Sequence, residues 1–261
     1  MNVLYKNMVF IGKLTTSQTT ILLFKLVDAT DKNNVFAICP LHVLDPNTYK
    51  VKVQLTIEEE CNNIKEIIHV TVCLFPIQHT FLDIAMGVVE NPEVINNNQL
   101  LKGLSYLNTI PGVYGCITNK AAKILYANKN CVANILDTKI LSMNYTLGDK
   151  ENITLINGLP VSGGFILTDQ GAYSGSSGSV LTVDNNVLGI IVAAANLKDV
   201  GNGTESKNTN SNYSLAVDMF YILPHINPYS VAYILYFLNK TKYFIILQAV
   251  NNKISNKMVI L

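Results

Sequence analysis

Short apolar segments alternate with polar clusters along most of the chain. In residues 9–27 and 50–76, runs rich in Val, Ile, Thr and Phe are divided by polar stretches such as TTSQTT. Runs of this length, bounded by turn-forming residues, are typical of β-strands joined in a meander. The N-terminal part of the chain is therefore predicted to be β-structure.

The same pattern continues through the second half of the chain. The segments GVYGCIT, AAKILYA, CVANILD, NITLI, GGFILT, VLTV and VLGIIVAA follow one another, with turn signals about every ten residues. Short strands at this spacing are typical of all-β barrels and sandwiches. The best candidate for a boundary between two β halves is the stretch 101–111.

Helical periodicity is rare. A short turn is predicted around LHVLDPN, and near the C-terminus Met219, Ile222 and Leu223 recur at helical spacing until Pro224 breaks the pattern. Further on, YILYFL and YFIILQAV predict a packing helix and strand, with an exposed patch for a protein partner as the alternative. The role of residues 239–261 is left open.

The composition limits the class of protein. The chain has 261 residues, of which 49% are apolar, enough for a packed core. Only 14% of the residues are charged and the formal net charge is +1, so a nucleic-acid partner is not expected. All the cationic residues are lysine, and Asn and Ile are abundant, which indicates an AT-rich genome.

Three features of the sequence indicate the cellular location of the protein: its cysteines, its N-terminus and the apolar segment near its C-terminus. Cysteine occurs an odd number of times in a chain too large to need disulfides, which predicts mostly reduced thiols at Cys39, Cys61, Cys73, Cys116 and Cys131. Residues 1–20 show no secretory signal, so an intracellular or virion-associated location is favoured. Lys240 and Lys242 interrupt the apolar residues 229–250, so no membrane span is predicted.

The stretch SGSSGSVL combines a turn rich in serine and glycine with an apolar run that follows at once. A serine nucleophile needs a turn that projects its hydroxyl outward while two backbone N–H groups, here those of Gly175 and Ser177, point at a developing oxyanion. Glycine at 178 permits close approach of a neighbouring strand or substrate. Alone the motif is a weak signal, because Ser and Gly also fill ordinary turns.

A serine nucleophile also needs a base, and a carboxylate that orients the base. His42 lies in FAICPLHVLD, where an apolar run ends in a turn, and Asp83 lies in HTFLDIAMGVVE, where another apolar run begins. Both are predicted at strand ends, and the order His42, Asp83, Ser177 is that of the chymotrypsin-type triad. A partly buried surface histidine and a turn-capping aspartate are the alternatives.

Four stretches of the chain resemble, in the same order, segments of trypsin-like serine peptidases of the chymotrypsin fold. Within that family the resemblance is closer to the HtrA-like branch than to digestive trypsins. PLHVLD and LDIAMGVVE resemble the segments around the family's histidine and aspartate, LTDQGAYSGSSGSVL resembles the segment around its serine, and YSLAVDMFYIL resembles its last strand. The resemblance implies an all-β fold of two six-stranded antiparallel β-barrels with a C-terminal helix. Residues 1–105 would carry His42 and Asp83, residues 106–218 would carry Ser177, and residues 219–261 would form a helix and tail.

The resemblance also implies a role for each site residue. Ser177 would be the nucleophile, His42 the general base and then acid, and Asp83 the group that fixes the imidazole tautomer, with Gly175 and Ser177 as the oxyanion hole. The substrate, an extended polypeptide, would contact two further groups of residues: the strand edge Val192, Ala193 and Ala194, and the pocket residues Gly171, Ala172, Tyr173 and Ser174. Because Gly171 lies where trypsins have a carboxylate, a small or medium apolar side chain is expected before the scissile bond. No cofactor is needed.

Three departures from the family pattern stand out. Ser176 replaces an acidic residue that binds a freed N-terminus, so activation by N-terminal cleavage is not expected. Ser179 and Val180 replace Gly-Pro, and Pro40 and Leu41 replace two small residues before the histidine. The local backbone is open to question at both places. The PDZ domain common in HtrA proteins is not expected.

Other interpretations remain open. One is a trypsin-like module without activity that serves as a structural or virion scaffold component, although all three triad residue types are present. Another is a viral processing peptidase or virion component, suggested by the AT-rich composition and the lack of a PDZ domain. A metal site is not predicted, because the spacing of Cys61, His69, Cys73 and His79 matches no zinc pattern.

Overall fold

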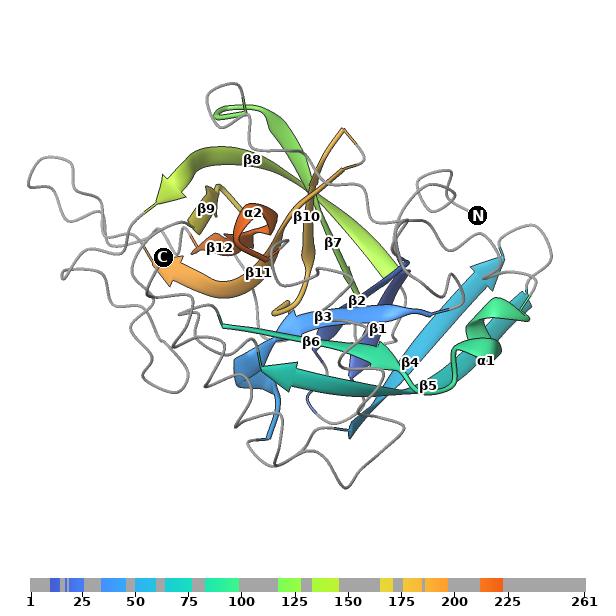
Figure 1. The fold of residues 1–261 in the computed structure, drawn as a ribbon. Helices are drawn as coiled ribbons and strands as arrows, with labels where there is room; N and C mark the ends of the chain where they lie inside the picture. Colours follow the sequence, from blue (N-terminus) through green and yellow to red (C-terminus); the bar gives the residue numbers. More distant parts are fainter. Residues whose placement is uncertain are drawn as a thin grey trace, which may run out of the picture.

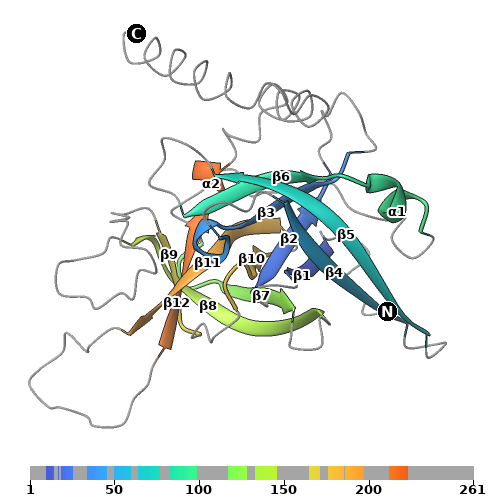
Figure 2. The same ribbon diagram turned by 90° about the horizontal axis from the view of Figure 1, so that it is seen from below.

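The computed structural model describes residues 10–14, 17, 19–25, 34–45, 50–59, 64–76, 83–98, 117–127, 133–145, 165–170, 176–184, 186–196 and 212–222. These residues form two closed β-barrels that lie side by side (Figures 1 and 2). Each barrel has six strands, and all neighbouring strands pair antiparallel. The predicted all-β fold of two six-stranded antiparallel barrels is confirmed.

The first barrel closes in the order β1-β2-β3-β6-β5-β4. Its strands are β1 (Phe10–Leu14), β2 (Thr20–Phe24), β3 (Phe36–Pro40), β4 (Lys50–Glu59), β5 (Ile64–Pro76) and β6 (Ile84–Val89). A 3₁₀ turn, Leu41–Val43, follows β3 at the place where the sequence predicts a short turn. A short helix, α1 (Pro92–Asn96), follows β6.

The second barrel closes in the order β10-β11-β12-β9-β8-β7. Its strands are β7 (Ala121–Ala127), β8 (Ala133–Tyr145), β9 (Phe165–Thr168), β10 (Val180–Val183), β11 (Asn186–Asn196) and β12 (Asn212–Asp218). A short helix, α2 (Met219–Ile222), follows β12, and in it Met219 and Ile222 are buried. The rest of the predicted helix and tail, and the predicted boundary at 101–111, lie outside the described residues.

The buried apolar side chains form three clusters, one drawn from each barrel and a third drawn from both. In β2, Ile21 and Leu23 belong to the first-barrel cluster, whereas Leu22 and Phe24 belong to the shared cluster. Because successive side chains of a strand point to opposite faces, β2 is buried both inside its barrel and against the second barrel. β3 and β6 are buried throughout in the same way. These three strands therefore form the first barrel's side of the interface.

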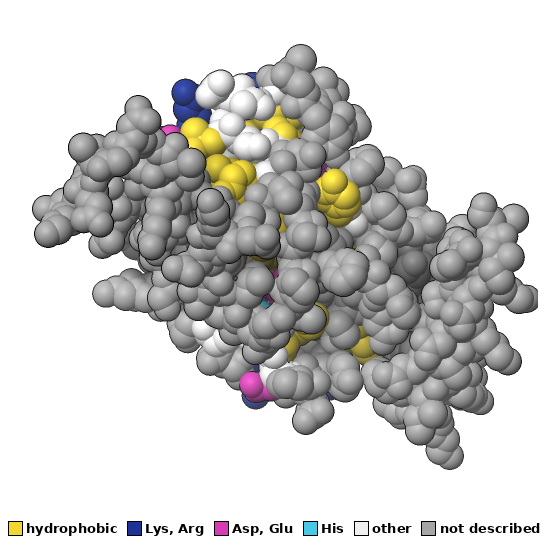
Figure 3. Space-filling view, turned by 90° about the vertical axis from the view of Figure 1, so that its left-hand side faces the viewer, with side chains coloured by type: hydrophobic (Ala, Val, Ile, Leu, Met, Phe, Trp, Pro, Cys, Tyr) yellow, Lys and Arg dark blue, Asp and Glu magenta, His cyan; other side chains and the backbone are white. Residues whose placement is uncertain are grey.

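The outer side of the β4–β5 hairpin is exposed to solvent. Lys52, Ile67 and His69 are exposed there, whereas their chain neighbours Val53 and Val70 are buried in the barrel. On another face of the molecule, the described hydrophobic side chains that are visible lie in small separate groups (Figure 3). No helix in the described ranges has the length and apolar character needed to cross a membrane.

Candidate active site

His42 and Asp83 are brought together by the pairing of two strands in the first barrel. Pro40 at the end of β3 pairs with Ile84 at the start of β6. The residues just beyond these strand ends, His42 and Asp83, therefore lie close together although they are 41 residues apart in the chain. The Leu41 N–H donates to the Asp83 carbonyl oxygen at 3.1 Å and holds the 3₁₀ turn against β6.

The Asp83 carboxylate holds His42 at two points. Oδ1 accepts a hydrogen bond from the His42 backbone N–H at 2.8 Å, and Oδ2 bonds to the ring Nδ1. A carboxylate only accepts hydrogen bonds, so this contact suits the ring tautomer that has its proton on Nδ1 and a lone pair on Nε2. The His42 side chain is 8% exposed and the Asp83 side chain 20%, so the pair is largely, though not fully, shielded from water.

Ser177 reaches this pair from the second barrel. It lies in the turn that precedes β10, and its Oγ is 3.3 Å from Nε2 of His42. A continuous line of side-chain contacts thus runs from Asp83 through His42 to Ser177. Along the chain Asp83 lies between His42 and Ser177, whereas in space His42 lies between the other two.

The turn that carries Ser177 depends on Gly178. Its φ angle is +83°, in the left-handed region that residues with a Cβ rarely adopt. A Cβ at this position would lie 1.8 Å from the Thr20 carbonyl oxygen, so β2 of the first barrel passes directly against the turn. The close approach of a neighbouring strand predicted at Gly178 is present.

Thr20 supports the site and is missed by the sequence analysis. It is fully buried, its backbone N–H donates to the Ser177 carbonyl oxygen at 3.1 Å, and its hydroxyl accepts from the Ala127 N–H at 3.1 Å. It therefore joins β2 both to the serine turn and to β7 of the second barrel. No local signal marks it, because TTSQTT reads as a polar turn and Ala127 lies 107 residues away.

The residues that depart from the family pattern lie beside the site. Ser179 and Val180 are fully buried, and Val180 begins β10. Pro40 ends β3, and Leu41 packs against the first-barrel cluster. With these residues in place, Oγ of Ser177 still lies within hydrogen-bonding distance of the His42 ring.

The predicted pocket and one predicted oxyanion amide fall outside the described residues, namely Gly171, Ala172, Tyr173, Ser174 and Gly175. The predicted substrate edge, Val192–Ala194, lies on β11. β11 pairs with β12 as far as Asn196, but its pairing with β10 ends at Ile190. In the described part of the chain, Val192–Ala194 therefore have a strand neighbour on one side only. The Val192 side chain itself is buried in the shared cluster.

The two described cysteines, Cys39 and Cys73, are free. Burial raises the pKa of the Cys39 thiol far above its ordinary value, and the nearby Asp83 carboxylate raises it further. Burial also raises the pKa of Cys73 to about 12, with a further contribution from its hydrogen bond to Glu90. Both thiols therefore stay protonated at neutral pH, which makes them poor nucleophiles.

Metal binding finds no support in the described residues. Within them, no group of three or more His, Cys, Asp or Glu side chains is arranged to hold an ion. Of the four residues considered for zinc, His69 and Cys73 lie on β5, and Cys61 and His79 fall outside the described ranges.

No family model matches the chain, and no curated protein matches its sequence. Several solved structures are similar to it. The match to Deg5 has a TM-score of 0.53 at 12% identity and covers 87% of this chain and 92% of that one. The apo MamO protease domain from Magnetospirillum magneticum gives 0.52 at 10% identity, covering 86% and 97%. An inactive form of Rv3671c from M. tuberculosis H37Rv gives 0.51 at 12% identity, covering 85% of each chain.

At these identities the similarity concerns the fold alone. The two side-by-side barrels have the fold of trypsin-like serine proteases. The resemblance that the four sequence stretches indicate is confirmed at that level.

Proposed function

We propose that this chain, which has the fold of trypsin-like serine proteases, is a serine endopeptidase that cleaves extended polypeptides. The observation that carries the proposal is the line of contacts from Asp83 through His42 to Ser177, with 3.3 Å between Nε2 and Oγ. A nucleophile, a base and a group that orients the base are the parts that acyl transfer requires within mutual reach.

In the proposed acylation step, Nε2 of His42 takes the proton of the Ser177 hydroxyl as Oγ attacks the scissile carbonyl carbon. Asp83 keeps the Nδ1 proton in place and stabilises the imidazolium. The carbonyl electrons move onto oxygen, and the amides of Gly175 and Ser177 are assigned to that oxyanion. His42 then gives its proton to the leaving amine as the C–N bond breaks, which leaves an acyl ester on Ser177.

Deacylation repeats these steps with water as the nucleophile. His42 takes a proton from the water, the ester C–O bond breaks, and the proton returns to Oγ of Ser177. The product acid leaves and the free serine is restored. The mechanism uses no cofactor.

Substrate binding is assigned to the loop before Ser177 and to the side of β11 on which the described residues place no neighbouring strand. An extended peptide would add as a strand beside Val192–Ala194, with main-chain hydrogen bonds as its main source of affinity. Gly171, Ala172, Tyr173 and Ser174 would form the pocket for the residue before the cut. A small or apolar side chain is proposed there, because Gly171 offers no charge to a basic one.

The proposal is tested by labelling with a fluorophosphonate probe, read by intact mass. Wild type is compared with Ser177→Ala, His42→Ala and the control Ser17→Ala, which removes the hydroxyl of an exposed serine. We expect one adduct on wild type and on Ser17→Ala. We expect none on the other two variants in the time that wild type needs to react fully, because neither presents an activated serine.

Two results would contradict the proposal. An adduct on Ser177→Ala at the wild-type rate would mean that another residue reacts. A folded wild-type protein that takes up no probe would favour an inactive trypsin-like module with a structural or scaffold role.

A further inference from the structure

Ser179 directs two donors to a single acceptor. Its backbone N–H donates to the Ser176 carbonyl oxygen at 3.0 Å, and its hydroxyl donates to the same oxygen. The side chain is fully buried, so water does not compete for this bond. The hydroxyl is therefore a second donor to an oxygen that the backbone already satisfies, at a position where the family pattern has glycine.

The oxygen that receives both bonds belongs to the peptide unit whose N–H is that of Ser177. In a trans peptide the C=O and N–H groups lie in one plane and point in opposite directions, and the described residues contain no cis peptide bond. Two bonds on the Ser176 oxygen therefore fix the direction of the Ser177 N–H. That N–H is an oxyanion donor in the proposed mechanism.

The rest of the turn is held by backbone groups of β2 and β11. The Gly178 N–H donates to the Ile191 carbonyl oxygen at 2.7 Å, and the Ile191 N–H donates to the Ser179 carbonyl oxygen at 2.8 Å. The Ser177 carbonyl oxygen accepts from Thr20. The Ser176–Ser177 peptide differs from these groups, because a side-chain hydroxyl also bonds to its carbonyl oxygen.

We propose that Ser179 is a positioning residue for the peptidase reaction: its hydroxyl aims the Ser177 N–H at the developing oxyanion. A hydrogen bond on the carbonyl also polarises the peptide unit, which makes its N–H a stronger donor. This inference rests on the proposed peptidase function and adds to it a residue that does not touch the substrate.

The test compares two buried hydroxyls in the same barrel. Ser179→Ala removes the hydroxyl bound to Ser176. The matched control, Thr182→Val, removes a buried hydroxyl on β10 that donates to the Lys123 carbonyl oxygen at 3.3 Å. The probe is a fluorophosphonate, because its phosphoryl oxygen gains negative charge as Oγ of Ser177 adds and needs the same donors as a peptide oxyanion. The maximal inactivation rate, the inhibition constant and the melting temperature are measured for each protein.

We expect Ser179→Ala to lower the maximal inactivation rate roughly tenfold, less than the loss of about 10²–10³ when an oxyanion donor itself is removed. The inhibition constant should stay unchanged, because the bond acts on the transition state. Thr182→Val should keep the wild-type rate although its melting temperature falls to a similar degree. If Ser179→Ala does not fold, Ser179→Gly also lacks the hydroxyl and carries the same expectations.

A Ser179 variant that reacts at the wild-type rate overturns the inference and leaves the proposed function standing. An equal loss of rate in Thr182→Val also overturns it, because the effect would then be general loosening of the barrel. A wild-type protein that does not react overturns the proposed function, and this inference with it.

Discussion

The two barrels contribute to the site in different ways. The first supplies His42 and Asp83, whose contact follows from the pairing of Pro40 with Ile84 inside one sheet. The second supplies Ser177, whose carbonyl is held by Thr20 of the other barrel. The histidine–aspartate pair is therefore internal to one barrel, whereas the serine is positioned across an interface.

Substitutions in the histidine–aspartate pair and substitutions at the interface should therefore have different effects. A change within the pair should impair the chemistry and leave the fold intact. A change at the interface should move Ser177 away from His42, destabilise the packing of the barrels, and leave the pair itself in place.

The largest effect is expected from Asp83→Asn, a substitution in the histidine–aspartate pair that should lower the reaction rate of Ser177. The asparagine oxygen still accepts the His42 backbone N–H, but its amide favours the wrong ring tautomer, with the proton on Nε2. We expect the rate of fluorophosphonate inactivation to fall about 10⁴-fold, with a melting temperature close to that of wild type. Asp45→Asn, at an exposed aspartate near His42, is the control and should react normally. A normal rate in Asp83→Asn would remove Asp83 from the mechanism.

The second-largest effect is expected from Gly178→Ala, which adds a side-chain atom where the serine turn meets β2 of the other barrel. The added Cβ would lie 1.8 Å from the Thr20 carbonyl oxygen, on a backbone with φ of +83°. We expect a loss on the order of 3 kcal/mol in the free energy of unfolding, from strain and overpacking together. Labelling of Ser177 should be lost as well. Chemical denaturation measures the first effect, and wild-type stability would show that β2 and the turn are not in close contact.

A smaller effect is expected from Thr20→Val, which keeps the shape of the side chain and removes its hydroxyl. The Ala127 N–H then loses its acceptor at a buried position, which costs about 1–3 kcal/mol of unfolding free energy. Thr20→Ser keeps the hydroxyl and loses one methyl group, and it should cost only about 0.8 kcal/mol. If chemical denaturation shows that Thr20→Ser is less stable than Thr20→Val, the Thr20 hydroxyl does not join the two barrels.

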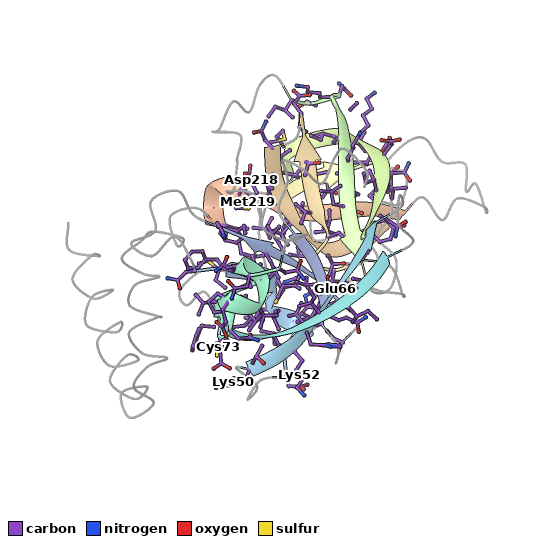
Figure 4. All side chains as sticks on the ribbon, turned by 90° about the vertical axis from the view of Figure 1, so that its right-hand side faces the viewer. Lys50, Lys52, Glu66, Cys73, Asp218 and Met219 are labelled. Atoms are coloured by element: carbon purple, nitrogen blue, oxygen red, sulfur yellow. The ribbon has the colours of Figure 1, made fainter. Side chains whose placement is uncertain are left out.

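The smallest effect is expected away from the interface, at Glu90. Lys50 and Cys73 lie together on the first barrel, far from Met219 of α2 (Figure 4), and Glu90 bonds to both of them. The hydrogen bond from Lys50 lowers the pKa of Glu90, and the bond from Cys73 adds to this against the opposing effect of burial. We expect Glu90→Gln to reduce stability slightly, because exposed ion pairs contribute little, and to leave labelling of Ser177 unchanged.

The pH dependence of that small effect has a definite sign. A carboxylate whose pKa is lowered on folding contributes stability above its ordinary pKa of 4.5, and the contribution disappears as the pH falls through the lowered value. The difference between wild type and Glu90→Gln should therefore be largest near neutral pH and vanish in acid. Melting curves across this range measure it, and a difference that grows in acid would contradict the assignment.

The same comparison explains what the sequence could predict. His42, Asp83 and Ser177 each lie where an apolar run meets a turn, so short motifs and their order identify them. The strands buried on both faces also appear in the sequence as continuous apolar runs, as in TILLF of β2. Thr20 could not be found in this way, because its importance comes from partners in the other barrel. The hydrogen bond from Ser179 to Ser176 could not be predicted either, because the sequence does not show which partner a serine in a turn will bond to.

In the proposed mechanism, Asp83 acts on Ser177 only through His42. It is tested most directly by the fluorophosphonate inactivation rates of His42→Ala, Asp83→Ala and the double variant, each followed over long incubation. We expect the double variant to react no more slowly than His42→Ala alone, because without the imidazole Asp83 has nothing to orient. If the double variant is slowed by the product of the two single losses, the two residues act independently, which would contradict this mechanism.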